Sequence, residues 1–389
     1  MDRSDFIYMD HAATTPVAPE VLEAMRPYFS EEFGNASSLH ARGRAALMAL
    51  DQARAAVAGL LGAHDDEIIF TSGGTESDNL AVRGVALASR ERGNHLIVSS
   101  VEHKAVLKTA HRLAELHGFR VTELPVDGYG RVDPADVEAA ICDETVLISV
   151  MTANNEVGTI QPIAEIGQIA REHGIPFHTD AVQAGGYLDI NADRLGVDLL
   201  TLAGHKLYGP KGVGVLYVRR GTPLEPVQTG GSHERGRRAG TENVAGIVGI
   251  ATALRLMQEQ RPTEVPRLRR LRDRVIEGVL AGVPDAMLTG HPVERLPHNA
   301  SFAIPGVEAD GLLVALDLKG VGVASGSACT SGSVEPSHVL QAMNVPYEAA
   351  VGSLRLTLGH FNTDEHVDYV LEVLPEVVER MRAIVAVVI

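Results

Sequence analysis

The chain alternates between short apolar runs and longer amphipathic stretches from about residue 67 to residue 218. Apolar runs of strand length recur at Ile68–Phe70, His95–Val98, Val146–Val150, Pro176–His178, Leu199–Leu202 and Val213–Val218. Stretches with helical periodicity lie between them, at Ser77–Arg90, Lys104–His117, Asp133–Ala140 and Ile163–His173. This alternation predicts an α/β fold whose mostly parallel sheet carries helices on both faces. Because ligands of such sheets bind at the carboxyl ends of the strands, we expect the chemistry there.

The pattern changes after Thr241. Helical periodicity covers Asn243–Glu259 and Arg267–Ala281, and the two prolines of Gln260–Pro266 between them predict a break in the helix. Apolar segments at 301–304 and 321–323 follow, and the chain ends in a predicted helix from residue 364. We therefore expect a large α/β domain that ends near residue 259 and a smaller α+β domain after about residue 260.

Composition supports a globular protein of about two domains, since the chain has 389 residues and is 45% hydrophobic. The formal charge of −16 argues against nonspecific nucleic-acid binding. Only two cysteines are present, Cys142 and Cys329, which predicts no disulfide framework or zinc knuckle and fits a reducing cytoplasm. The N-terminus has no apolar signal region, and no apolar run approaches the ~18 residues of a membrane span.

A glycine-containing turn, Thr71–Ser77 (TSGGTES), follows the first predicted strand and opens a helix. Glycines let backbone N–H groups approach a ligand closely, and a helix N-terminus favours an anion. The Thr75 hydroxyl adds a further donor. The segment is thus a candidate phosphate site, although a plain turn with a Ser/Thr cap has the same composition.

Two further residues follow predicted strands. Asp180 ends the strand that includes His178, where a carboxylate is well placed to contact a ligand or to cap the next turn. Lys206 follows the strand Leu199–Leu202 in a loop of small residues. A lysine desolvated there loses its proton and forms a Schiff base, whereas a surface lysine would not. Together, the phosphate turn, the carboxylate and the lysine are the parts that a pyridoxal 5'-phosphate (PLP) site needs.

Cys329 lies within ten consecutive small, uncharged residues, 324–333 (ASGSACTSGS). Such a segment is a poor core element and predicts a loop. A free thiol there attacks as the thiolate, or it serves merely as a small side chain in a turn. Arg355 is a lone cation among apolar residues, which suits either a carboxylate clamp or a structural salt bridge. His103 follows the strand that starts near His95, and is either a site residue or a structural histidine.

These motifs resemble those of the cysteine desulfurases in the class V aminotransferase family, within the fold-type I PLP enzymes. The resemblance extends from Tyr8–Pro16 (YMDHAATTP) to Phe361–Thr363 (FNT), nearly the whole chain. Ser325–Gly332 (SGSACTSG) resembles the long-loop group of the family, which serves iron–sulfur cluster assembly and thiolation. The resemblance implies a fold-type I transferase with a large α/β domain over residues 15–259, and a small α+β domain made of residues 1–14 and 260–389 that carries the Cys329 loop.

The resemblance also implies how the cofactor is held. Lys206 matches the Schiff-base lysine, and Asp180 matches the partner of the pyridine nitrogen. Gln183 matches a hydrogen bond to the ring hydroxyl. His103 matches an imidazole that stacks on the ring and handles protons.

The phosphate contacts carry over in the same way. Gly74, Thr75 and His205 match phosphate contacts, and Thr241 matches a threonine that reaches the phosphate across a homodimer interface. The family often has serine where this chain has Ala203, so one phosphate hydroxyl is missing.

The substrate side follows from three positions. Asn155 matches a residue that contacts both cofactor and substrate, and Arg355 matches the substrate carboxylate contact. Cys329 matches the persulfide carrier. No resident metal is implied, although transient ligation of an iron–sulfur cluster through Cys329 is compatible with such a residue.

The implied reaction converts L-cysteine to L-alanine, leaves a persulfide on Cys329 and passes the sulfur to acceptor proteins. Selenocysteine lysis or transamination on the same fold is the nearest alternative, and an aminotransferase would not need Cys329. A thiol hydrolase using Cys329 and His103 would not need Lys206. A non-catalytic sulfur carrier or scaffold would bind partners without turnover.

Overall fold

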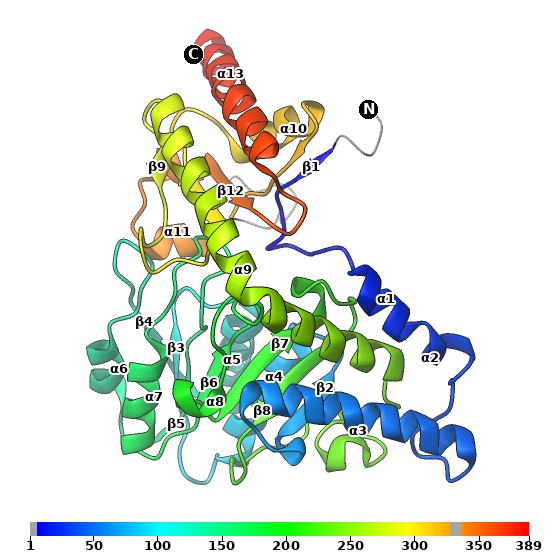
Figure 1. Cartoon of the computed structure of the whole chain (residues 1–389). Helices are drawn as coiled ribbons and strands as arrows, with labels where there is room; N and C mark the ends of the chain where they lie inside the picture. Colours follow the sequence, from blue (N-terminus) through cyan, green and yellow to red (C-terminus); the bar gives the residue numbers. More distant parts are fainter. Residues whose placement is uncertain (1–5, 327–335, 389) are drawn as a thin grey trace.

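The computed structural model describes residues 6–326 and 336–388 of the chain, and the side chains up to residue 383. Figure 1 shows two lobes, a large lower one and a smaller upper one. The large lobe is built on a sheet of seven strands in the order β2-β8-β7-β6-β5-β3-β4. Their bounds are Ile68–Thr71 (β2), His95–Ser99 (β3), Arg120–Leu124 (β4), Thr145–Ser149 (β5), Phe177–Asp180 (β6), Leu199–Ala203 (β7) and Gly214–Val218 (β8).

The large sheet is mostly parallel, as the alternating pattern predicts. Only β8 runs antiparallel to its two neighbours, β2 and β7. All strands except the edge strand β4 are buried on both faces: Ile68 and Phe70 belong to one apolar core, and Ile69 between them belongs to the other. Period-2 alternation explains this division, because successive side chains of a strand point to opposite faces.

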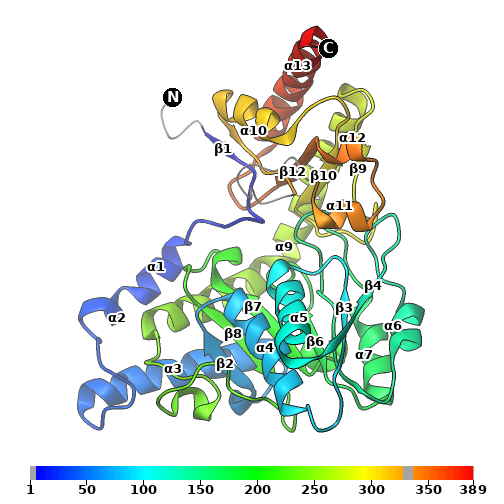
Figure 2. The same cartoon turned by 180° about the vertical axis from the view of Figure 1, so that it is seen from behind.

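Helices cover both faces of this sheet (Figures 1 and 2). The helices α4 (Gly74–Ala88) and α5 (Lys104–His117) pack on one face against the core that contains Ile69. The other helices of the large lobe are α1 (Pro19–Met25), α2 (Pro27–Ser30), α3 (Ala41–Leu61), α6 (Pro134–Ala140), α7 (Ile163–Glu172) and α8 (Ala192–Leu195). Short 3-10 turns occur at η2 (Asp65–Glu67), η3 (Gly204–Lys206) and η4 (His233–Gly236).

The small lobe combines both ends of the chain. An antiparallel sheet has the order β12-β10-β9, with β9 at Met287–Leu288, β10 at Asn299–Ala303 and β12 at Ser353–Thr357. Strand β1 (Ile7–Tyr8) pairs in parallel with β11 (Val321–Gly322). The helices are α10 (Ala309–Leu318), α11 (His338–Ala342), α12 (Tyr347–Ala350) and α13 (Asp364–Val388). The predicted α+β character and the final helix from Asp364 are confirmed.

The predicted break near residue 260 is wrong, because a single helix, α9, runs from Val244 to Gly282 with Pro262 and Pro266 inside it. Figure 1 shows α9 bending as it passes from the large lobe into the small one. Each proline removes one backbone hydrogen bond, but both prolines are exposed and the apolar face of the helix stays buried on either side of them. Tertiary packing therefore turns a predicted break into a bend, and the proposed boundary at 259/260 falls inside this helix.

Within the described residues, no helix is both long enough and apolar enough to span a bilayer.

Candidate active site

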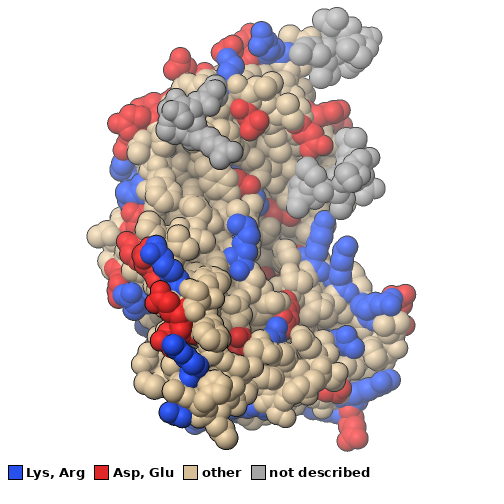
Figure 3. Space-filling model, turned by 90° about the vertical axis from the view of Figure 1, so that its right-hand side faces the viewer, with Lys and Arg blue, Asp and Glu red and all other residues tan. Residues whose placement is uncertain are grey.

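A cavity of about 520 Å³ lies between the two lobes. On the face shown in Figure 3, Lys and Arg side chains border the recess between the lobes. The large lobe supplies the carboxyl ends of its strands and the small lobe supplies Leu313, Val323 and Arg355. The cavity brings together nearly all the site residues that the sequence predicts and the structure describes, namely Gly74, Thr75, His103, Asn155, Asp180, Gln183, His205, Lys206 and Arg355.

The N-terminus of α4 forms one wall of the cavity, with Gly74 and Thr75 as its first residues. No side chain caps this helix end, so backbone N–H groups of its first turn are open to an anion. A Cβ atom at Gly74 would lie 3.0 Å from Cγ2 of Val182 and 3.5 Å from Cβ of Ala203. Glycine therefore keeps this wall open for a ligand.

Lys206 ends the 3-10 turn η3, directly after β7. Its Nζ donates hydrogen bonds to the carbonyl oxygens of Ala12 and Ala13, at 2.5 and 2.6 Å. Burial, together with the positive charge of Arg355, lowers the pKa of Lys206 from 10.5 to about 8. A substantial fraction of this amine is thus neutral near physiological pH, as a nucleophilic lysine requires.

Two buried carboxyl groups, Asp180 and Asp78, line the cavity, and the buried Glu102 interacts electrostatically with Asp180. Burial raises the pKa of Asp180 at the end of β6, which accepts a hydrogen bond from the N–H of Val182 at 2.9 Å. Burial raises the pKa values of Asp78 and Glu102 as well, and the charge of Asp180 adds to both shifts. Because three such acids in a low-dielectric region do not all ionise together, we assign the negative charge to Asp180, which faces His103 and Lys206.

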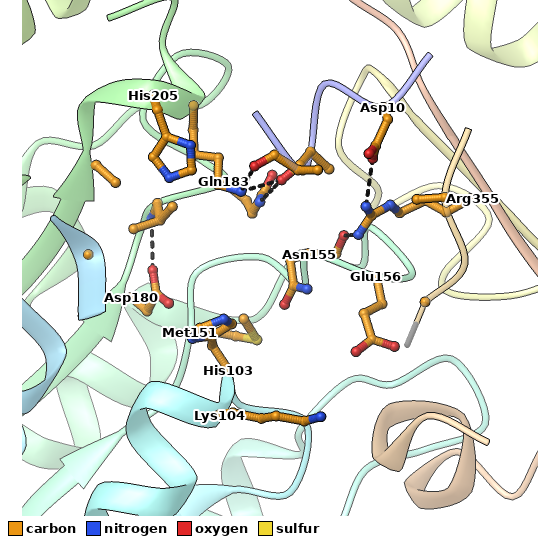
Figure 4. A pocket seen from close by; sticks show the side chains of 18 of the residues that line it. Asp10, His103, Lys104, Met151, Asn155, Glu156, Asp180, Gln183, His205 and Arg355 are labelled. Atoms are coloured by element: carbon orange, nitrogen blue, oxygen red, sulfur yellow. Dashed lines mark hydrogen bonds and ion pairs between the residues drawn. The ribbon is translucent and has the colours of Figure 1, made fainter. Parts of the chain in front are cut away.

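His103 stands at the N-cap of α5, where its Nδ1 accepts a hydrogen bond from the N–H of Ala105 at 3.2 Å. This bond leaves Nε2 to carry the proton of the neutral ring. Ligand atoms of His103, Asp78 and Asp180 all lie within 4.8 Å of one another. The imidazole and the two carboxyl groups therefore lie close together. Figure 4 shows His103 and Asp180 below Gln183.

Arg355 occupies the small-lobe side of the cavity (Figure 4). Its Nη2 pairs with Oδ1 of Asp10 at 2.8 Å, and its Nη1 donates to the carbonyl oxygen of Asn155 at 2.9 Å. The side chain is only 7% exposed, and its Nε is buried without a partner. Arg355 thus has a structural ion pair and still lines the cavity, so the two roles left open by the sequence are compatible.

Gln183 and His205 complete the wall near Lys206. The side chain of Gln183 donates to the carbonyl oxygen of Ala12 at 3.0 Å. His205 lies with Nδ1 3.2 Å from Oγ1 of Thr14, and burial together with the charge of Lys206 lowers its pKa to about 4. A neutral imidazole remains, which can donate a hydrogen bond without adding charge.

Sequence reasoning missed several lining residues, notably Asp10, Asp78 and Glu156. Glu156 accepts a hydrogen bond from the hydroxyl of Ser337, and burial raises its pKa to about 7. Asp10 lies within the N-terminal motif Tyr8–Pro16, and Glu156 follows Asn155 directly. These positions were the signals that could have found them.

Thr241 does not line the cavity of its own chain and is exposed. The segment before it is held firmly, because Arg54 of α3 forms a bidentate ion pair with Glu234 at 2.7 and 2.8 Å, and both side chains are buried. Cys329 lies outside the described residues, although the cavity reaches the last described residue before it, Gly326.

Comparison with known proteins identifies the family of this chain. The family model described as Aminotransferase class-V matches residues 7–370. The chain belongs to the class V aminotransferase family. Cysteine desulfurase IscS of Dictyoglomus turgidum is 52% identical over 97% of this chain and 96% of its own length. Cysteine desulfurase IscS of Methanosarcina thermophila is 53% identical over 97% and 93%, respectively.

Solved structures of family members confirm the fold-type I architecture. A NifS-like protein superposes with a TM-score of 0.90 at 36% identity and covers 96% of this chain and 100% of its own. A structure described as SspA in complex with cysteine superposes with a TM-score of 0.81 at 38% identity, over 92% and 100% of the two chains.

The cavity fits PLP, the cofactor that this fold family implies. The uncapped end of α4 suits a phosphate, and desolvated Lys206 suits an aldehyde. Asp180 is a buried strand-end carboxylate to which a pyridinium N–H could donate a hydrogen bond.

Proposed function

We propose that the protein is a cysteine desulfurase, which converts L-cysteine to L-alanine and transfers the sulfur to Cys329 as a persulfide. One observation carries the proposal: a single cavity places a desolvated lysine, a buried strand-end aspartate and an open helix N-terminus beside Arg355, in a chain about half identical to cysteine desulfurases. The predicted role in iron–sulfur cluster assembly agrees with the relatives named IscS.

In the proposed site, Lys206 would hold the aldehyde of PLP, Asp180 the pyridine nitrogen and Gln183 the ring hydroxyl. The phosphate would lie at Gly74, Thr75 and His205. The imidazole of His103 would stack on the cofactor ring. When bound, PLP supplies an electron sink that stabilises negative charge at the α-carbon of an amino acid.

The substrate would be oriented by Arg355 and Asn155. Arg355 presents an unpartnered buried Nε, and its pair with Asp10 fixes the guanidinium plane. A guanidinium in this position binds an α-carboxylate and aligns the amino acid above the base of the cavity. Lys206, neutral above about pH 8, takes the proton from the α-carbon, and His103 exchanges protons through Nε2.

The transfer of sulfur from the substrate to Cys329 requires no added oxidant. The Cys329 thiolate attacks the sulfur of the substrate, the bond between sulfur and the β-carbon breaks, and an S–S bond forms. The β-carbon gains a proton, alanine leaves and the persulfide passes to an acceptor protein. An aminotransferase would have no use for this thiol, and a hydrolase would have no use for Lys206.

A homodimer belongs to the same proposal. Thr241 is exposed and lies outside its own cavity, which agrees with a role at the phosphate of a second copy. A cytoplasmic location is also proposed, supported by the presence of only two cysteines in 389 residues.

The test is to load the purified protein with PLP, add L-cysteine with dithiothreitol, and measure alanine, sulfide and the visible band of the cofactor. We expect equal amounts of alanine and sulfide, and a band that borohydride bleaches. Lys206→Ala should abolish the bleaching, while Cys329→Ala should keep it and lose sulfide release. Pyruvate in place of alanine, or no band after PLP addition, would exclude the proposal. Comparison of cysteine with selenocysteine separates the desulfurase from a selenocysteine lyase.

A further inference from the structure

A second hollow of about 770 Å³ borders the active-site cavity, on the outer side of α4 and α5. The two hollows share Thr75, His103 and Lys104 in their walls. The outer hollow is therefore a direct neighbour of the active-site cavity. We call it the α4–α5 groove.

The α4–α5 groove is basic in an acidic protein. Arg83, Lys104, Lys108 and Arg112 line it and are all exposed, whereas the chain carries a formal charge of −16. Arg112 pairs with Glu115 at 2.6 Å. Across the described part of the chain, the side chains of the other three cations have no ion pair.

Glu115 on α5 and Glu123 on β4 already have basic partners. Glu115 pairs with Arg112, and Glu123 lies 2.7 Å from Nε2 of His111. The unpaired cations are thus free for an anionic partner. Lys104, Lys108 and Arg112 recur every four residues on α5, which places their charges in one stripe along the helix.

One exposed apolar side chain accompanies this stripe. Leu113 and Leu116 also line the groove, and Leu116 is 56% exposed whereas Leu113 is 2% exposed. A row of cations with an exposed leucine at its end suits an amphipathic helix with acidic residues. The lining has no Phe, Tyr or Trp on which nucleotide bases would stack, so the groove favours a protein segment over a nucleic acid.

We propose that the α4–α5 groove docks an acidic, amphipathic segment of the protein that accepts the sulfur. The inference rests on the proposed desulfurase function and names the chemistry of its partner. Opposite charge in the groove would speed the encounter and align the acceptor thiol beside the active-site cavity. The groove would select acceptors by their charge and contribute little to the reaction with small thiols.

The experiment uses three peptides of equal length with one cysteine at the same position: an acidic amphipathic helix, a variant with Gln in place of Glu, and one with Lys in place of Glu. The rate of sulfur transfer from the PLP-loaded enzyme to each peptide is measured at low and at high salt. We expect the acidic peptide to react at least about tenfold faster than the Gln peptide at low salt, with the advantage shrinking as salt rises.

A double variant, Arg83→Glu with Lys108→Glu, should abolish the preference for the acidic peptide and favour the Lys peptide. Its alanine formation with dithiothreitol should equal that of the wild type, because neither residue lines the active-site cavity. The matched control is Arg269→Glu with Arg380→Glu, which reverses two exposed charges outside the groove and should keep the preference.

Equal rates for the three peptides, or loss of preference in the control variant, would overturn the docking proposal. An oligonucleotide that competes as well as the acidic peptide would also overturn it, since the groove would then bind nucleic acid. A double variant that sediments as a monomer would overturn it too, since the groove would then contact a second copy of the chain. Failure of the desulfurase function itself is distinguishable, because the dithiothreitol assay would then yield no alanine with the wild type.

Discussion

At the scale of single residues, desolvation sets the chemistry of the site. Lys206 and His205 are both held toward their neutral forms, while Asp180 is left as the acceptor for a cation. The same physical effect acts in opposite directions on bases and acids, since burial disfavours whichever form is charged. A cavity made this way is prepared for a cofactor with a cationic ring nitrogen and an electrophilic carbonyl.

The lowered pKa of Lys206 predicts how the apo-protein takes up PLP. Because the neutral amine is the reactive form, the initial rate of covalent attachment should rise by about tenfold per pH unit up to about pH 8 and then level. Borohydride trapping followed by mass measurement gives the rate at each pH. An exposed lysine would keep gaining reactivity towards its ordinary pKa of 10.5, so a rate still climbing between pH 8.5 and 10 would contradict the assignment.

Ala203 offers a gain-of-affinity prediction. Its Cβ lies within reach of a Cβ placed on Gly74, at 3.5 Å, so a hydroxyl at this position would face the uncapped end of α4. Ala203→Ser should add one hydrogen bond to the phosphate and slow PLP release by about 2- to 10-fold. Ala203→Cys serves as the control, because its thiol is of similar size and only a weak hydrogen-bond donor. Release at an unchanged rate in the serine variant would mean that the phosphate lies elsewhere.

Which site residues the sequence could reveal depends on motif and position. Lys206, Asp180 and Thr75 each follow a strand, so their place at one sheet edge could be predicted. Asp78 could not, because a helical position shows its orientation only when the helix packs. The exposed, out-of-cavity place of Thr241 likewise depends on a loop, whose path no periodicity records.

At the scale of elements, packing outweighs local propensity. The prolines of α9 predict an end to the helix, yet Leu268, Leu271 and Val275 beyond them are buried and keep it continuous. The bounds of α5, by contrast, match the predicted stretch Lys104–His117, and Gly118 in the left-handed conformation ends the helix.

The buried ion pair between Arg54 and Glu234 connects η4 to α3. Glu234 and Arg235 both have positive φ, 46° and 58°, which are unfavourable for these residue types. Glu234→Gln would leave the buried Arg54 uncompensated and should lower the free energy of unfolding by about 3 kcal/mol. Urea denaturation measures the change.

The matched control is Glu259→Gln, in the exposed pair with Arg255 on α9, which should cost less than about 1 kcal/mol. If the two variants lose the same free energy of unfolding, the buried Arg54–Glu234 pair contributes no more to stability than the exposed pair does.

At the scale of the whole molecule, the α/β class, the mostly parallel sheet and the α+β C-terminal part are all predictable, because alternation of strands and helices is a long-range signal. The antiparallel placement of β8 is not, since a strand's apolar pattern is the same in either direction. The joining of the N-terminal residues to the small lobe came from the family resemblance, not from periodicity.

The proposed homodimer leads to a prediction for mixed dimers. One subunit is wild type and the other carries Lys206→Ala together with Thr241→Ala, so only the wild-type cavity retains PLP covalently. If Thr241 acts across the interface, this cavity should release PLP several-fold faster than in a mixed dimer with Lys206→Ala alone. Identical release rates would place Thr241 away from the neighbouring phosphate. Sedimentation should give about twice the 41.4 kDa chain mass.

The contribution of both chain ends to the small lobe has a consequence for synthesis on the ribosome. Asp10 forms a bridge with Thr357 and an ion pair with Arg355, and the carbonyl oxygens that hold Lys206 follow it at Ala12 and Ala13. A nascent chain that has emerged as far as α9 already contains the complete large sheet but not the strand that receives its own N-terminus. Reactive Lys206 therefore acquires its native surroundings only when translation is nearly finished, and premature capture of the cofactor by an incomplete chain is disfavoured.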